Sequence, residues 1–411
     1  MEDCIKKRRA LLSVFITFAV SALSASIIFP ILAPLFLNPA NTLIQREIPD
    51  TMLSIFFGFF LGAFPLAQFI FAPILGEYAD SRGRRRIFLI TLIVEVVGYA
   101  LCGFAIQERH LSLLFIGRFL TGFAAGNMSV CLATLADLSK NEKTRTHYFG
   151  LGAAVAGTMF VLGPFLGGKL SDHSLYKHFS LAFPMWVGAF LAFCNLVFVF
   201  FFFKETLQER HKKPLDPISS LHNIQKAFSN KQIQGLYLLY FFFLLGWNML
   251  YQFLPALMVE KFHASSAKIG NLTALMGLIW IVGSLSLVFL KHTYISKKKV
   301  ALASLLIFAI ATLLLPFPER LLFFTLSSGV AVFCAGVLWP LFTQAISKNA
   351  APEMQGKMLG LSQSVQSLSM ALAPFLGGFI LQAHNKVPFI VAAGSGLVAL
   401  ILLRKNHEKL F

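Results

Sequence analysis

Hydrophobic segments of roughly twenty residues alternate with short polar segments along almost the whole chain. A helix needs about 20 apolar residues to cross the hydrocarbon core of a bilayer. Twelve segments are near that length, and we expect each to be a membrane-spanning helix. They cover residues 10–37, 52–76, 87–106, 111–136, 149–170, 180–203, 235–260, 267–290, 300–316, 320–346, 357–383 and 387–404. The pattern therefore predicts an all-α membrane protein.

The first hydrophobic segment also has features of a signal peptide. Basic residues from Lys6 to Arg9 precede it, and small residues at 21–26 could form a cleavage site. The hydrophobic sequence nevertheless continues to Leu37, which makes the segment long enough to span a bilayer. We therefore expect it to be the first of the twelve helices.

Composition agrees with this class. Hydrophobic residues make up 57% of the 411 residues and charged residues 13%, which excludes an ordinary soluble domain. The five cysteines stand singly, without a CxxC pair, so we expect neither disulfides nor a metal site.

The net charge of +17 could indicate nucleic-acid binding or membrane orientation. Of the 35 lysines and arginines, 26 lie in segments on the side of the two termini and 8 in the loops opposite. Loops in the cytoplasm carry the excess of basic residues in membrane proteins. We therefore expect both termini in the cytoplasm, a cytoplasmic (inner) membrane, and no nucleic-acid partner.

The longest polar stretch, residues 204–234, divides the chain into two halves. Asp216-Pro217 and the apolar residues after it predict a helix on the membrane surface. Residues 150–170 and 360–380 are identical at nine of twenty-one positions, at an offset of 210. This repeat indicates duplication, and we expect domains at 1–203 and 235–411 joined by a linker at 204–234.

A basic segment with the sequence GEYADSRGRRR separates the second and third predicted helices. We expect a turn outside the hydrocarbon, because backbone groups in a turn need water or headgroups. Gly76 would let two backbones approach and Gly83 would supply the positive φ of a tight turn. This segment resembles the loop between the second and third helices of major facilitator superfamily transporters. The motif that the resemblance marks as conformational comprises Gly76, Asp80, Arg82, Gly83, Arg84 and Arg85.

The resemblance implies the fold of that superfamily, with twelve helices in two pseudo-symmetric six-helix bundles. It also implies that Asp80 approaches the start of the eleventh predicted helix, near residues 355–360, when the transporter is open to the outside. Arg118 and Gly122 resemble the family's fourth-helix motif, whose arginine serves the transport site or proton transfer. A structural role for Arg118, as an anchor to the outer surface, is the alternative.

A third motif resembles the glycine-rich fifth helix of drug–proton antiporters. It comprises Gly150, Gly163, Pro164, Gly167 and Gly168. With further matches along the chain, the resemblance narrows to the tetracycline-resistance-like branch. The sequence departs from that branch in the first predicted helix, where residues 13–36 carry no charge, and in the ninth, which lacks the expected acid.

Glu95 is the only acid deep in a predicted span. Thr91, Glu95, Tyr99 and Cys102 recur at helical spacing, so this face should look into the bundle. A carboxyl there can exchange a proton near neutral pH, or it can be a neutral group fixed by hydrogen bonds for packing. We expect Glu95 and Arg118 to differ by about 8 Å along the membrane normal, so that they could pair.

Amphipathic side chains of the second half could form a mostly apolar pocket with a few polar contacts. The predicted solute-binding candidates are Asn127, Asn248, Tyr251, Gln252, Trp339 and Gln344, and Trp247, Asn271 and Trp280 accompany them.

We therefore expect a monomeric secondary transporter that moves a small organic solute by alternating access. We expect it to export this solute, with the export driven by protons. An importer of a metabolite is the alternative, and a transporter-like receptor a further one. We expect neither an enzyme nor a cofactor, because the sequence shows no phosphate-binding GxxxxGK[ST] motif and no Ser/His/Asp set.

Overall fold

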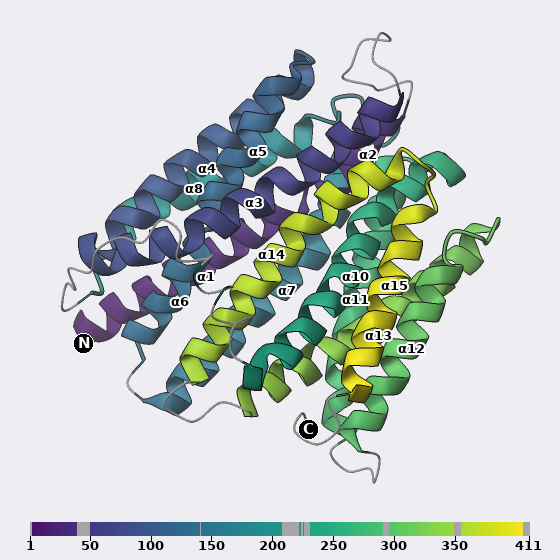
Figure 1. Ribbon diagram of the computed structural model, residues 1–411. Helices are drawn as coiled ribbons and strands as arrows, with labels where there is room; N and C mark the ends of the chain where they lie inside the picture. The colour runs from purple at the N-terminus through teal and green to yellow at the C-terminus, as the bar shows by residue number, and fades with distance from the viewer. Residues whose placement is uncertain are drawn as a thin grey trace. The chain divides into compact units, whose positions relative to one another are not determined.

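A computed structural model describes residues 2–38, 50–139, 141–207, 222, 225, 231–290, 296–348 and 355–405 (Figure 1). Within these residues the regular secondary structure is helical throughout, which confirms the predicted class. The helices are α1 (Glu2–Ser26), α2 (Phe29–Leu37), α3 (Asp50–Arg82), α4 (Arg84–Gln107), α5 (Leu111–Ala125), α6 (Asn127–Asp137), α7 (Glu142–Leu170), α8 (Phe183–Phe202), α10 (Lys231–Phe262), α11 (Ser266–Leu290), α12 (Lys297–Leu314), α13 (Leu321–Lys348), α14 (Gln355–Leu381) and α15 (Val387–Lys405). The predicted surface helix of the linker lies largely outside the described residues.

Eleven spans within the described residues are long and apolar enough to cross a membrane. The ninth predicted span corresponds to α12, which is not among the eleven. Its 18 residues open with three lysines, Lys297 to Lys299, which lie where a helix leaves the hydrocarbon. The apolar remainder of α12 is consistent with a twelfth span.

Two predicted spans are interrupted in the structure. The first consists of α1 and α2, and Pro30 lies in the first turn of α2, where its missing N–H costs no helical hydrogen bond. The fourth consists of α5 and α6, with Gly126 between them. The first of these breaks lies beside the glycine-rich part of α7 described below.

The connection between α3 and α4 is much shorter than the predicted eleven-residue turn. Helix α3 continues through Arg82 and α4 begins at Arg84, so Gly83 alone lies between them. Its φ of 99° confirms the predicted positive φ, which a side chain would strain.

The chain forms two compact units. Unit 1 comprises residues 1–47, 63–219 and 265–274, and unit 2 comprises residues 48–62, 220–264 and 275–411. In unit 1, α4 packs between α5 and α8, and α1 packs against α7. In unit 2, α10 packs against α14 and α15, and α12 lies beside α13 and α15. The predicted division at 204–234 stays a prediction.

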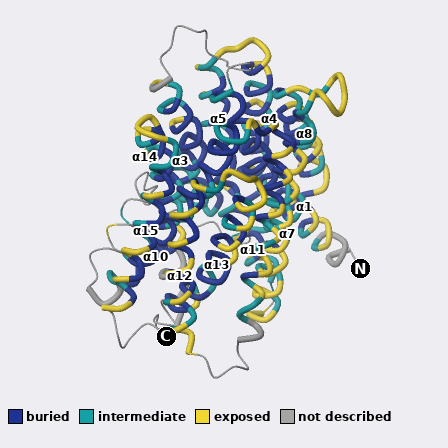
Figure 2. The backbone as a smooth tube through the Cα atoms, turned by 90° about the vertical axis from the view of Figure 1, so that its right-hand side faces the viewer, coloured by how far each residue is buried: buried dark blue, intermediate teal, exposed yellow. Residues whose placement is uncertain are grey.

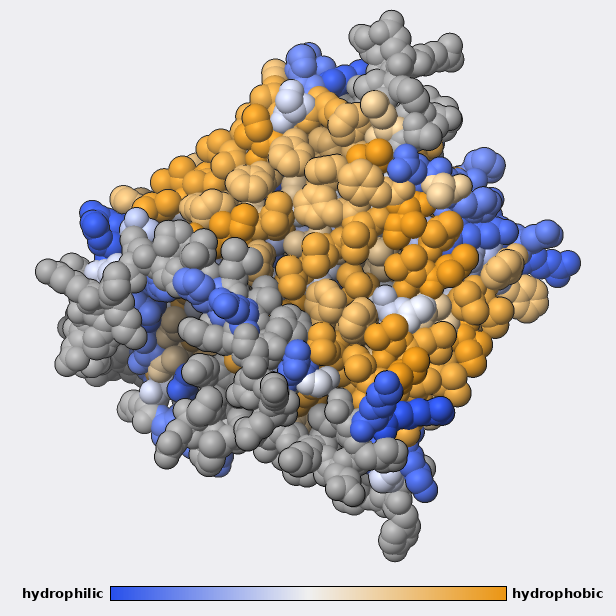
Figure 3. All heavy atoms as spheres, viewed as in Figure 1, coloured by the Kyte–Doolittle hydropathy of each residue, from blue (hydrophilic) through white to orange (hydrophobic). Residues whose placement is uncertain are grey.

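The burial pattern is that of helices in lipid. Buried positions line the helix faces turned toward neighbouring helices (Figure 2). On the face shown in Figure 3, hydrophobic residues cover the middle and hydrophilic ones gather at the edges. Large apolar side chains such as Phe190 and Phe201 on α8 and Leu322 on α13 are exposed, as expected for side chains that contact lipid tails.

Candidate functional site

Helix α1, whose membrane-spanning part carries no acid, has a row of buried hydroxyl groups along one face. Ser13, Thr17, Ser21 and Ser24 follow one another at three- or four-residue spacing, so they share one helix face, and each is at most 3% exposed. Each of the last three hydrogen-bonds a polar side chain of another helix. Thr17 pairs with Asn195 of α8, Ser21 with Asn127 of α6, and Ser24 with Glu95 of α4.

Glu95 lies at the centre of this arrangement. The predicted inward face of α4 is confirmed, because Thr91, Glu95, Tyr99 and Cys102 are all fully or almost fully buried. Ser24 Oγ donates to Glu95 Oε1 at 2.5 Å, while Glu95 Oε2 has no hydrogen-bond partner. Burial of a carboxyl with one unpartnered oxygen is unfavourable, and such atoms in native proteins call for an explanation in function or bound water.

Three further polar atoms, on α4, α5 and α6, are buried without a hydrogen bond of good geometry. They are Tyr99 Oη, Arg118 Nε and Asn127 Nδ2. Tyr99 lies one turn after Glu95 on α4, and Gly98 beside it packs against Gly117, the residue before Arg118 of α5. The interior of unit 1 therefore holds an acid and a cation, Glu95 and Arg118, with unused hydrogen-bonding capacity. Two neutral polar residues, Tyr99 and Asn127, have unused capacity as well.

The predicted contact between Glu95 and Arg118 is absent from the structure, in which both residues are described. The Arg118 guanidinium instead lies over the ring of Phe64, with 4.8 Å to the ring centroid. This cation–π contact partly replaces the lost hydration of a group that is 3% exposed.

Sequence reasoning missed Ser21 and Ser24 as site residues. The available signal was their spacing with Ser13 and Thr17, which places four hydroxyls on one face of a hydrophobic helix. Their partners are 106 and 71 residues away in the sequence, so the pairing itself requires the fold.

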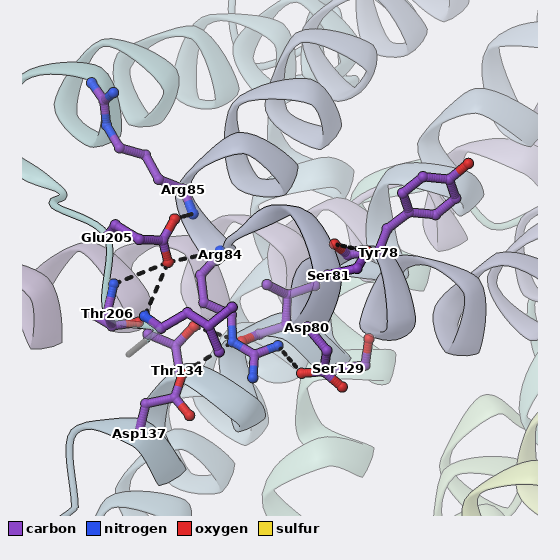
Figure 4. A network of polar contacts seen from close by, with 12 residues as sticks. Tyr78, Asp80, Ser81, Arg84, Arg85, Ser129, Thr134, Asp137, Glu205 and Thr206 are labelled. Atoms are coloured by element: carbon purple, nitrogen blue, oxygen red, sulfur yellow. Dashed lines mark hydrogen bonds and ion pairs between the residues drawn. The ribbon is translucent and has the colours of Figure 1, made fainter. Parts of the chain in front are cut away.

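The conformational motif forms a second polar network, at the junction of α3 and α4 (Figure 4). The Arg84 side chain is 5% exposed and lies between two carboxylates. Its Nη1 is 2.6 Å from Asp80 Oδ1, and its Nε donates to Asp137 Oδ2 at 3.0 Å. Arg85 donates to the carbonyl of Phe200 at 2.8 Å, whereas Arg82 is exposed. The predicted approach of Asp80 to the start of α14 stays a prediction.

Glu205, in the segment after α8, caps the first turn of α4. Its carboxylate accepts hydrogen bonds from the backbone N–H groups of Arg84 at 2.9 Å and Arg85 at 3.2 Å, as Figure 4 shows. The first N–H groups of a helix lack partners within the helix, and its positive dipole end favours an anion. Glu205 thus ties the end of α8 to the α3–α4 junction.

The prediction that Gly76 lets two backbones approach is wrong. A methyl group at Gly76 would meet only Ser129, at 3.5 Å from its Oγ, which is an ordinary contact. The serine hydroxyl bonds to the carbonyl of Ala72 instead. Gly76 therefore does not mark a close approach of two backbones.

The glycines of α7 divide into two groups. Nothing lies within 4 Å of a methyl group placed on Gly150, so this glycine does not serve close packing. Gly163 and Gly167 instead lie directly against Ser26 and Ile27, at the break between α1 and α2. A methyl group on Gly168 would come within 3.0 Å of Gly270 Cα, so α7 and the start of α11 meet with their backbones nearly touching.

Unit 2 contains the predicted aromatic residues as one cluster. The Trp247 ring centroid lies 5.2 Å from that of Tyr251 and 4.4 Å from that of Trp280. Trp280 is 5.7 Å from Trp339, which in turn contacts Tyr240. The three tryptophans come from α10, α11 and α13 and are each half-buried, so they present a shared aromatic surface.

Two polar candidates of unit 2 are engaged with α14. Asn248 Nδ2 donates to Ser369 Oγ at 3.0 Å, and Gln252 Nε2 approaches the carbonyl of Met370 at 3.4 Å. Gln344 lies apart, since it is exposed and accepts a hydrogen bond from Lys297 at 2.7 Å. The structure therefore does not add Gln344 to the aromatic cluster.

A family model described as Major Facilitator Superfamily matches residues 14–290 and 236–410. The chain belongs to this superfamily. It is 25% identical to the class H tetracycline resistance protein of Pasteurella multocida, over 90% of this chain and 89% of that one. It is 26% identical to the major facilitator superfamily domain-containing protein 10 of Mus musculus, over 86% of this chain and 79% of that one.

Solved structures agree on the fold. The D-xylose-proton symporter is similar with a TM-score of 0.73, 13% identity and coverage of 98% of both chains. The human organic anion transporter MFSD10 is similar with a TM-score of 0.68 and 24% identity, over 97% of this chain and 99% of that chain. The protein is therefore an integral, multi-pass membrane transporter with the major facilitator fold.

Proposed function

We propose that this transporter exports a small organic solute in exchange for protons, with Glu95 as the proton-carrying group. The observation that supports this is the carboxyl of Glu95, which is fully buried, bonded once to Ser24 and otherwise unpartnered. Of the acids in the membrane-spanning segments that the structure describes, Glu95 is the one that is fully buried.

The physical basis is the cost of a charge in a low-dielectric interior. An ionised carboxylate there requires strong hydrogen bonds or a nearby cation, whereas the protonated acid requires neither. Ser24 supplies one hydrogen bond to the ionised form, and Arg118 supplies a positive charge within the same unit. Glu95 can therefore exist in both states, and gain or loss of its proton can bias the conformations that the transporter visits.

The aromatic cluster supports an amphipathic solute. The aromatic rings offer flat apolar surface; they belong to Trp247, Tyr251, Trp280 and Trp339. Asn248 and Gln252 of α10, the helix that carries Trp247 and Tyr251, offer amide groups. The names of two relatives suggest probes, since one is a tetracycline resistance protein and the other an organic anion transporter. Tetracycline and the anion fluorescein represent these classes.

For orientation, we propose that both termini and the α3–α4 junction face the cytoplasm, in a cytoplasmic membrane, and that the monomer is the working unit. In a cysteine-free protein, a cysteine at Ser81 should resist an impermeant thiol reagent applied to intact cells, while one at Lys177 should react. Reaction of the Ser81 variant from outside would reverse the proposed orientation.

The coupling is tested in proteoliposomes with an imposed pH gradient. Tetracycline or fluorescein flux should follow the gradient in the wild type and lose that dependence in Glu95→Gln, with binding retained. Glu260→Gln is the matched control, because Glu260 is a half-buried acid at the end of α10. A Glu95→Gln protein that still moves its solute in step with the gradient would remove Glu95 from the mechanism. Flux in the same direction as protons would favour the alternative, an importer.

A further inference from the structure

Three of the unpartnered polar atoms of unit 1 belong to the adjoining helices α4 and α5, namely Glu95 Oε2, Tyr99 Oη and Arg118 Nε. Ser24 Oγ is bonded to Glu95, and the Tyr99 hydroxyl lies near the Ser24 side chain. Gly98, the residue before Tyr99, packs directly against Gly117, the residue before Arg118, so Tyr99 and Arg118 lie on adjoining turns of α4 and α5. Two hydroxyl groups, of Ser24 and Tyr99, therefore accompany an acid and a cation on the adjoining helices α1, α4 and α5.

Three hydroxyl residues of α1 bond side chains of other helices, and Ser24 is the one of them that bonds a carboxyl, whereas Thr17 and Ser21 bond asparagines. Ser13, Thr17 and Ser26 donate to carbonyls of their own helix, at 2.9 Å in each case. Such bonds are the usual way for a hydroxyl to be satisfied inside a helix. Ser24 gives its one proton to the Glu95 carboxyl instead. Its hydroxyl is therefore available to link α1 with α4.

The ring of Tyr99 is held by close packing. A methyl group on Gly188 of α8 would lie 2.8 Å from the ring, so only glycine leaves room for it there. The residue is 1% exposed, and its hydroxyl has no hydrogen bond of good geometry. A phenol that is fixed and unsatisfied in this way is placed to accept or donate when a neighbour moves.

Few other charged or titratable groups face Glu95. Tyr99 lies on its own helix, Arg118 on α5 and Cys131 on α6. Residues 10–26 of α1 include no titratable side chain, and Cys194 of α8 is exposed. Arg118 is therefore the buried cation on the helix that packs most closely against α4, and it does not touch Glu95.

We propose that Ser24 and Tyr99 are positioning residues that join Glu95 to Arg118 by a chain of hydrogen bonds when Glu95 is ionised. Arg118 then donates to Tyr99, Tyr99 to Ser24 and Ser24 to the carboxylate, with a water molecule closing any gap. Every donor in this chain points toward the negative charge, which favours the ionised form. Protonation of Glu95 removes the acceptor at the end of the chain, and the chain opens. This inference rests on the proposed role of Glu95.

The test is an infrared pH titration of the purified protein, which needs no knowledge of the solute. The carbonyl band of a buried protonated carboxyl should disappear as pH rises in the wild type and be missing in Glu95→Gln. In Ser24→Ala and in Tyr99→Phe the band should persist to higher pH, by about one pH unit, since a hydrogen bond to a charged group has been lost. Ser24→Thr keeps the hydroxyl and should titrate close to the wild type.

Thr91→Val and Ser13→Ala are the matched controls. Thr91 lies one turn from Glu95 on α4 and, like Ser13, bonds only to carbonyls of its own helix. Both controls should titrate as the wild type does.

The outcomes separate this inference from the proposed function. If Glu95→Gln removes the band but Ser24→Ala and Tyr99→Phe titrate like the wild type, the chain is wrong and Glu95 remains the proton carrier. If the band persists in Glu95→Gln, Glu95 is not the titrating group and both proposals fail. Equal shifts in the two control variants would show that any lost hydroxyl perturbs the carboxyl, which would also overturn the chain.

Discussion

The interiors of the two units differ in chemistry. Unit 1 buries an acid, two arginines and five hydroxyl residues of α1, with several polar atoms unpaired. Unit 2 gathers three tryptophans and two tyrosines into one cluster. Charge and proton exchange need buried polar groups, whereas an organic solute needs apolar surface with few polar contacts. The two helical units therefore offer two different chemical environments.

One close backbone contact is in contrast common to the two units. In unit 1, Gly168 of α7 packs against Gly270 of α11, and in unit 2, Gly378 of α14 packs against Gly58 of α3. The two glycines Gly168 and Gly378 occupy equivalent positions of the sequence repeat. The close packing is thus present at both equivalent positions, whereas the polar and aromatic side chains of the two units differ.

This shared packing gives the prediction with the largest expected effect on stability. Gly168→Val and Gly378→Val should each lower the free energy of unfolding by about 1–3 kcal/mol, because the added side chain meets backbone that cannot move aside. Thermal unfolding in detergent measures this. Gly150→Val is the control, since nothing lies within 4 Å of that position. Stability loss in only one of the two units would mean that the contacts are not equivalent.

The difference in chemistry is tested by separating affinity from coupling. Trp339→Ala should weaken binding of tetracycline or fluorescein about tenfold, through loss of about 1.4 kcal/mol of ring contact, while flux keeps its response to the pH gradient. Glu95→Gln should do the reverse. Titration calorimetry and proteoliposome flux report the two effects. If Trp339→Ala removed the pH response, the division between the units would be wrong.

Sequence patterns predicted the parts of this arrangement that depend on one helix at a time. The spans, the positive φ of Gly83 and the buried face around Glu95 follow from length, residue type and helical period. The pairing of Ser24 with Glu95 and the cap by Glu205 could not be predicted in this way, because each joins helices whose rotation about their axes is set by packing. The expected close approach at Gly76 failed because a glycine in a helix is also compatible with open space beside it.

The α3–α4 junction of unit 1 can be compared with the start of α12 in unit 2. Arg84 is buried between Asp80 and Asp137, whereas Lys297 is exposed and bonded to the neutral Gln344. Asp137→Asn should therefore slow transport several-fold, because it leaves a buried arginine with one carboxylate, and Lys297→Gln should have little effect. Initial rates of flux at saturating solute measure this. Similar rates for Asp137→Asn and the wild type would reduce the network to a signal for orientation.

The smallest expected effect concerns how the same two helices begin. The first turn of α12 is capped by its own Ser296, whose side chain accepts from the N–H of Lys299 at 3.4 Å. The first turn of α4 is capped by Glu205, which is 120 residues away from Arg85 and also accepts from Thr206 N and Leu207 N. Glu205→Gln keeps one acceptor oxygen but loses the charge at the helix N-terminus, which is worth about 0.3–1 kcal/mol.

Hydrogen exchange distinguishes the two caps by where protection is lost. Glu205→Gln should speed amide exchange at Arg84 and Arg85 and also in the segment at Thr206 and Leu207, since one carboxylate holds both. Ser296→Ala should affect only the first turn of α12, around Lys299. The non-local cap makes the end of α8 and the start of α4 a single cooperative unit, which the local cap of α12 cannot do. Unchanged exchange at Arg84 and Arg85 in Glu205→Gln would show that packing of the α3–α4 junction, and not the carboxylate, holds these amides.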